Sequence, residues 1–182
     1  MYRASDFDAA LPLFFSYADK IWVKVNKSKQ EAESLENALD VISLSFIQTD
    51  GARSLNAYFD QAGTKFYESI IYNRVAKTYI DKKIYKEAAE VYEALIQRHP
   101  FDPDAPELSS AIINTYDLGG FPSLVVTAKE QFVEHYNPVS TYWQQASPDM
   151  RDRLSPTLEG HIVDLAKHYH ATAQETGQVA DY

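Results

Sequence analysis

The alternation of apolar and polar residues predicts amphipathic helices, most clearly between Phe66 and Pro100. One apolar stripe recurs every three or four residues up to the polar run at 81–83, and a second stripe of the same period follows it. The two stripes consist of Tyr72, Val75, Ala76 and Tyr79, and of Tyr85, Ala88, Ala89, Tyr92, Leu95 and Ile96. Because a very short turn joins them, two helices of about 14 residues should pack antiparallel. One hairpin cannot bury both of its faces, so it needs stacked neighbours.

Similar patterns flank this hairpin on both sides. Asp104 is a plausible N-cap for the next helix, and Gly119–Gly120 should end that helix. The other predicted helices cover residues 7–14, 35–47, 52–61, 104–118 and 122–136. The first of these matches the second helix of the clear hairpin. We therefore expect a half hairpin followed by three helix pairs.

The stretch 139–156 departs from this pattern, and we interpret it as a helical insertion. It contains Tyr142–Trp143 and two Ser-Pro pairs, and we expect a short helix, a turn and another helix capped by Ser147. The tyrosine-tryptophan pair is expected to seal the insertion onto the neighbouring helices, and an exposed anchor for a partner is the alternative. A further helix should then run from Leu158 to Gln174, with Ile162, Leu165, Ala166 and Tyr169 facing inward.

The clear hairpin resembles a tetratricopeptide repeat over Ser69–Asp102. That motif of about 34 residues has aromatic, large, small and aromatic positions on its first helix, and aromatic and small positions before a terminal proline on its second. Here the positions are Tyr72, Val75, Ala76, Tyr79, Tyr85, Ala88, Tyr92, Leu95 and Pro100, with Leu95 standing where alanine is usual. The resemblance implies an all-α, right-handed solenoid of about three and a half helix hairpins with one insertion. We interpret 1–182 as a single fragment of a longer solenoid; a natural chain with capping helices is the alternative.

The chain also resembles segments of long, uncharacterised tetratricopeptide proteins from the proteobacterial cell envelope. The phrases that carry this resemblance are Leu118–Leu124, Thr141–Trp143 and Leu165–His170. It implies a periplasmic or outer-membrane-associated location and names no substrate.

In the tetratricopeptide family, the first helices line a concave groove that binds peptides. Carried over position by position, this implies a protein or peptide partner held by Asn73, Lys77, Asp81, Asn114, Lys167 and His170. Asparagine and lysine side chains can bond to a peptide backbone or a carboxylate. The family's carboxylate clamp is incomplete here, and an ordinary solvated surface is the alternative.

The amino-acid composition and the absence of known motifs exclude several classes of function. The 182 residues include no cysteine, which excludes a disulfide scaffold, a cysteine-ligated zinc and thiol catalysis. The formal net charge of −9 argues against nucleic-acid binding. No apolar run reaches the length of a membrane span. Neither a nucleophile elbow nor a phosphate-binding glycine-rich loop is present, so we expect neither an enzyme nor a cofactor.

Three alternatives remain beside the binding scaffold. The segment could be a structural spacer within a larger envelope protein. His161, Asp164 and His168 lie on one helix face and could form a metal site or an enzyme centre. The basic run Lys20, Lys24, Lys27 and Lys29 could bind a membrane surface, although acidic residues follow at once and favour a helix end or linker with one buried tryptophan.

Overall fold

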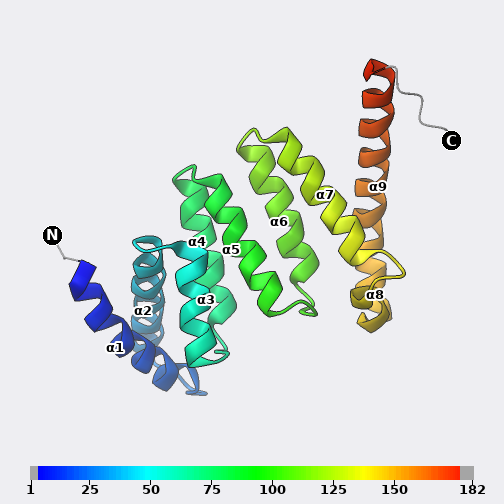
Figure 1. Cartoon of the computed structure of the whole chain (residues 1–182). Coiled ribbons are helices and arrows are strands. Elements are labelled where there is room, and N and C mark those ends of the chain that lie inside the picture. The colour runs from blue at the N-terminus through cyan, green and yellow to red at the C-terminus, as the bar shows by residue number, and fades with distance from the viewer. Residues whose placement is uncertain (1–3, 177–182) are drawn as a thin grey trace. The chain divides into compact units, whose positions relative to one another are not determined.

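The computed structural model describes residues 4–176, with side chains from residue 10 onward, and confirms an all-α chain. Helix makes up 81% of it, and no strand occurs in this range. The helices are α1 (Ala4–Trp22), α2 (Lys29–Ile47), α3 (Gly51–Ala62), α4 (Glu68–Asp81), α5 (Tyr85–Arg98), α6 (Ala105–Leu118), α7 (Pro122–Tyr136), α8 (Thr141–Gln145) and α9 (Pro148–Thr176) (Figure 1). Contacts divide the chain into two compact units, Met1–Leu95 and Ile96–Tyr182.

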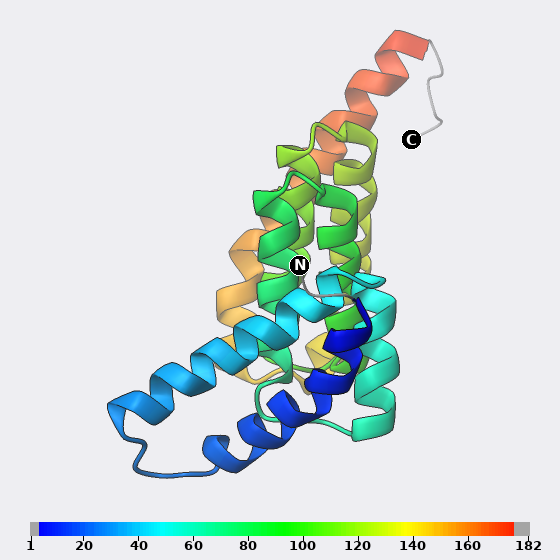
Figure 2. The ribbon, with the colours of Figure 1, turned by 90° about the vertical axis from the view of Figure 1, so that its left-hand side faces the viewer.

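In the first unit, α1 and α2 form an antiparallel hairpin, and α2 also packs against α3 and α4 (Figure 2). Ser28 caps α2 through a capping box with Glu31, so this helix begins six residues before the start expected at Leu35. The core between these helices is aromatic: the Phe15 ring stacks on Tyr58 at 3.9 Å, and Trp22 packs edge-on against Tyr67 at 5.6 Å. Aromatic rings supply much of the buried area that stabilises such a small unit.

Two helix pairs end their first helix with the same turn. After α4, the backbone N–H of Ile84 donates to the carbonyl of Tyr79 (2.8 Å), with Lys83 at a φ of 61°. After α6, the N–H of Phe121 donates to the carbonyl of Tyr116 (3.0 Å), with Gly120 at a φ of 71°. Both are Schellman turns, and the two lie 37 residues apart in the sequence. The turns therefore recur with the spacing of the tyrosines that precede them.

Gly51 explains why the chain breaks between α2 and α3. Its φ is +42°, and a Cβ atom placed there would lie 2.7 Å from the hydroxyl oxygen of Tyr79 on α4. Only glycine tolerates both the backbone conformation and this close approach.

In the second unit, α6 and α7 are antiparallel, and α7 also packs against α8 and α9. Helices α6 and α9 run in the same direction (Figure 1). Rings from α7 and α8 form the centre of this unit: Phe132 lies edge-on to Tyr136 at 4.7 Å, and Tyr136 lies edge-on to Tyr142 at 4.8 Å. Tyr142 is buried, in agreement with a sealing role for the Tyr142–Trp143 pair.

The expected division between the insertion and the last helix is wrong. Ser147 does cap a helix, its hydroxyl accepting from the N–H of Met150, but this helix is α9 and it continues through Pro156 as far as Thr176. A proline leaves the carbonyl four residues earlier without its helical partner, here that of Asp152. Because Pro156 and Asp152 are both exposed, water can satisfy that carbonyl and the helix need not end.

Burial confirms the predicted core of α4 and α5 and corrects that of α9. Tyr72, Val75 and Ala76 are fully buried, and so is Ala88. On α9, Leu165 is buried as expected, whereas Ile162, Ala166 and Tyr169, which should also face inward, are exposed. The outer part of α9 therefore lies on the surface of its unit.

Replacing Gly51 with alanine should lower the free energy of unfolding by about 2 kcal/mol, because the new Cβ meets Tyr79 and the backbone is left-handed. Urea denaturation followed by circular dichroism measures the change. In a Tyr79→Phe background the same substitution should cost less, since the closest contact is with the hydroxyl.

Gly160→Ala is the matched control. Gly160 lies within α9, and among the described residues nothing comes within 4 Å of an added Cβ. Alanine there should stabilise by about 0.5–1 kcal/mol. Equal effects at the two glycines would contradict the packing assigned to Gly51.

Candidate functional site

The second unit contains a cleft of about 220 Å³ between α6 and α9. Its lining comprises Pro103, Pro106, Glu107, Ser110, Ala111, Asn114, Phe132, Tyr142, Met150, Arg153, Leu154 and Thr157. The α6 and α9 residues recur at intervals of three and four, so each helix presents one face to the cleft. The two helices run in the same direction (Figure 1), and the residues that each contributes form two walls of the cleft.

The floor of the cleft is apolar and held firmly in place. Phe132, Tyr142 and Leu154 are all buried there. Tyr142 stands on the short helix α8, whose N-terminus is capped by the Ser140 hydroxyl accepting from the N–H of Trp143 (3.1 Å). The Tyr142 hydroxyl donates to the carbonyl of Asp102 (3.3 Å), which ties α8 to the start of α6. The floor is thus formed by residues that also hold the unit together.

The rim is polar and exposed. Glu107 and Asn114 stand on the α6 side, and Arg153 and Thr157 on the α9 side. In the described part of the chain, no ion pair within 4 Å engages Glu107 or Arg153. The cleft therefore offers an amide, a hydroxyl and two charged groups to an incoming molecule.

Carboxylates dominate the electrostatics at the Tyr142 end. Burial raises the pKa of the Tyr142 phenol, and the charges of Glu107, Asp102 and Asp104 raise it further, while only Arg153 acts against them. More carboxylates than cations therefore act on the Tyr142 hydroxyl at this end of the cleft.

The six predicted groove residues fall in three places. Asn114 lines the cleft. Asn73, Lys77 and Asp81 follow one another every four residues along the exposed side of α4 in the first unit, where the Asn73 amide donates to the carbonyl of Ser69 (2.8 Å). They form one stripe, as the helical period requires.

Lys167 and His170 lie on the exposed outer part of α9 and do not line the cleft. Lys167 is ten residues beyond Thr157, which is about 15 Å along a helix. The His170 ring lies 3.0 Å from the side-chain amide of Gln174, one turn further on. The structure therefore does not join these two residues to Asn114.

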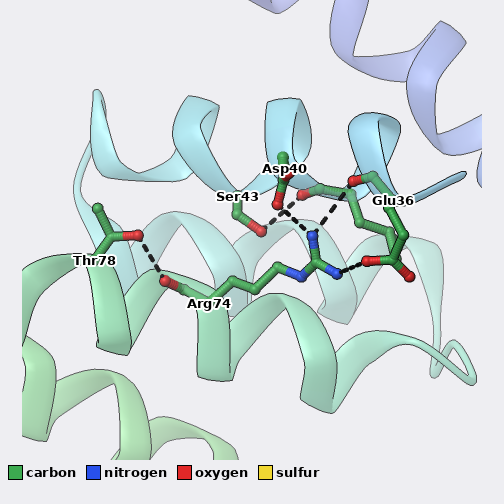
Figure 3. Close-up of polar contacts among 6 residues, drawn as sticks. Glu36, Asp40, Ser43, Arg74 and Thr78 are labelled. Carbon is green, nitrogen blue, oxygen red and sulfur yellow. Dashed lines mark hydrogen bonds and ion pairs between the residues drawn. The ribbon is translucent and has the colours of Figure 1, made fainter. Parts of the chain in front are cut away.

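Beside the α4 stripe, an ion-pair network fixes α4 to α2. The guanidinium of Arg74 donates to the carboxylates of Glu36 and Asp40 and to the backbone carbonyl of Glu36 (Figure 3). The Thr78 hydroxyl donates back to the carbonyl of Arg74 (2.8 Å). The repeat pattern did not single out Arg74. Its guanidinium nevertheless joins α4 to α2 through ion pairs with two carboxylates.

The proposed histidine-aspartate metal cluster is engaged in other contacts. Asp164 accepts from the Lys129 ammonium on α7 (2.6 Å), which lowers the pKa of that carboxyl. The His161 ring packs edge-on against Phe132 (4.7 Å), and the His168 ring packs against Tyr169 (5.4 Å). Among the described side chains, no three metal-ligating groups gather closely enough to hold an ion.

Sequence reasoning missed the α9 wall of the cleft. Met150, Arg153 and Leu154 fall within the stretch 139–156 that the sequence assigns to an insertion, separate from the helix expected over 158–174. The missed signal is the apolar period that continues across Pro156, through Met150, Leu154, Leu158 and Leu165.

No family model, curated protein or solved structure matches this chain. In the part of the chain that the structure describes, no helix combines the length and apolar character that crossing a membrane requires.

Replacing Arg74 with glutamine should lower the free energy of unfolding by about 1 kcal/mol, because two carboxylates lose their shared cation. The loss should shrink in 1 M NaCl, where salt screens the wild-type pairs. Lys77→Gln, on the exposed stripe of the same helix, is the control and should change stability by less than about 0.5 kcal/mol. A loss that does not change with salt would show that Arg74 acts through packing instead.

The folded structure should lose stability as the pH falls below about 6.5, the ordinary pKa of histidine. Burial first, and then the Lys129 charge, lower the pKa of His161, so protons bind the unfolded chain more tightly. Stability is therefore full above that pH and declines as the pH falls towards the lowered value. Denaturant titrations between pH 7.5 and 5.5 should show that stability depends less on pH in His161→Gln than in wild type. Equal slopes for wild type and His161→Gln would contradict the assignment.

Proposed function

We propose that this chain is a non-catalytic scaffold that binds a peptide segment of a partner protein. The main support for this proposal is the cleft between α6 and α9. Asn114, which the sequence predicts to contact a peptide, lines this cleft. We further propose that its helices form a tetratricopeptide-like, right-handed solenoid of helix hairpins with a helical insertion.

Recurrence of local structure supports the repeat interpretation. The turns after α4 and α6 share one hydrogen-bond pattern at a spacing of 37 residues. Stacked hairpins of this kind present their first helices along one surface, which is where such proteins carry binding residues. The α4 stripe of Asn73, Lys77 and Asp81 offers a second polar surface of that type in the first unit.

The size and chemistry of the cleft favour a peptide. Small-molecule sites usually enclose about 300–1,000 Å³ and bury most of the ligand. A cleft of 220 Å³ is smaller than that range and accommodates one or two side chains of a segment that stays partly in solvent. Above an apolar floor, the Asn114 amide and the Thr157 hydroxyl are placed to bond to a peptide backbone.

The rival functions differ in what they require. A spacer needs no occupied cleft, so peptide binding there separates it from a scaffold. A metal centre needs His161, Asp164 and His168 together, whereas each of them has another neighbour here. By resemblance, the partner belongs to the bacterial cell envelope, in the periplasm or at the outer membrane.

A displayed library of random 12-residue peptides tests the proposal. Peptides selected on the purified wild-type chain should lose at least about tenfold in affinity for a Thr157→Trp variant, because an indole at the exposed rim fills the cleft. Glu159→Trp places the same ring on an exposed α9 position outside the lining and should bind like wild type. Fluorescence anisotropy of labelled peptides gives the dissociation constants.

Circular dichroism should show the same helix content in wild type and both tryptophan variants. Peptides that bind all three proteins equally would place the binding surface elsewhere. If no peptide is retained by the wild type, the spacer becomes the better account.

A further inference from the structure

Acidic groups outnumber basic groups near the Tyr142 end of the cleft. Glu107 on α6, with Asp102 and Asp104 just before that helix, act together on the Tyr142 hydroxyl. On the α9 side Arg153 is the cation that acts on the same group. Three carboxylates against one guanidinium leave a net negative field, which attracts a cation.

The neighbouring cation Arg151 is already engaged. Its guanidinium donates to the backbone carbonyls of Trp143 (2.9 Å) and Gln144 (3.2 Å), where it holds α8 against α9. Asp102 is also placed by the fold, since its carboxylate accepts from the N–H of Asp104 (2.8 Å). The Asp102 carboxylate is thus held at the start of α6 by this turn.

The floor below these charges suits a long aliphatic stem. Phe132, Leu154 and Pro106 are buried apolar side chains, and the Tyr142 ring adds a second aromatic surface. Lysine and arginine lay their methylene groups along apolar surface while keeping the charged head in water. Aromatic rings also attract such a head when it passes over their faces.

We propose that the cleft receives a lysine or arginine side chain of the partner peptide, with its stem on the apolar floor and its head beside Glu107, near Asp102 and Asp104, which flank the lining residue Pro103. This inference rests on the proposed function, because it names the chemistry of the peptide that the same cleft binds. A purely apolar anchor would cover carboxylates without pairing them, which is costly. An acidic anchor would meet three like charges and one opposite charge.

Selected peptides from the random library provide the probe. They should be enriched in lysine and arginine relative to the unselected library, and replacing that basic residue by glutamate should abolish binding. Glu107→Gln should weaken the wild-type-selected peptides about fivefold, and Arg153→Gln should strengthen them by a similar factor. Affinity should fall when NaCl is raised from 50 to 500 mM, because screening weakens the attraction.

Two further variants guard against indirect effects. Glu159→Gln removes an acid from α9 outside the lining and should leave affinity unchanged. Asp104→Asn removes a carboxylate that acts on the Tyr142 hydroxyl without changing a lining residue, and its effect should have the same sign as that of Glu107→Gln.

The outcomes separate this inference from the proposed function. Acidic or purely apolar peptides that still lose affinity for Thr157→Trp, with Glu107→Gln neutral or strengthening, would overturn the basic anchor and leave the scaffold intact. Basic peptides that bind Thr157→Trp as well as wild type would overturn both. Opposite shifts at Glu107 and Arg153, together with loss in Thr157→Trp, would establish both.

Discussion

Edge-to-face packing of three aromatic rings, from Phe132 through Tyr136 to Tyr142, is the interaction on which the second unit depends. It joins α7 to α8, and the Tyr136 hydroxyl lies 2.9 Å from that of Ser109 on α6. Burial of Tyr136 raises the pKa of its phenol to about 12, so this hydroxyl stays protonated and able to donate at any physiological pH. Because α9 starts two residues after Ala146, which follows α8, the position of these rings also decides where the second wall of the cleft begins.

The same packing separates the residues that keep the unit folded from those that can contact a partner. Side chains that must be buried for folding form the floor, and side chains that can change without loss of the core form the rim. Substitutions on the rim can therefore alter what binds while leaving the unit folded. This separation also explains why the rim charges are open to a partner: the fold satisfies its own polar groups through Ser140, Arg151 and the carbonyl of Asp102.

Local signals predicted most of the fold. The helices before and after Gly119–Gly120, the break at Asp50–Gly51 and the cap at Ser147 follow from turn residues and the apolar period. Each prediction lies within a few residues of its place in the structure. The break expected between the insertion and the last helix is absent, although Pro156 lies there. The free-energy cost of a proline within a helix depends on whether the carbonyl four residues earlier reaches water, and this depends on the tertiary structure. The inward face predicted for α9 is wrong for a similar reason. The apolar period shows which side chains share a face, but not whether another helix covers Ile162 or Tyr169.

The candidate site was predicted only in part. Asn114 followed from its repeat position, but its partners in the cleft come from α8 and the start of α9, and no local pattern connects Glu107 with Arg153 across 46 residues. Lys167 and His170 were predicted as groove residues by the same repeat positions, but they lie further along α9, outside the cleft. The repeat pattern thus pointed to one residue that lines the cleft, whereas the other lining residues depend on the tertiary contacts that bring them together.

A two-dimensional ¹H–¹⁵N NMR titration of the labelled chain with a library-selected peptide tests most directly whether the cleft binds a peptide. If it does, the amide signals that shift most should belong to Ser110, Asn114, Leu154 and Thr157 along the two walls, and those of α2 and α3 should stay unchanged. Shifts that spare α6 and α9, or that appear only on exposed parts of the first unit, would contradict a peptide-binding cleft in the second.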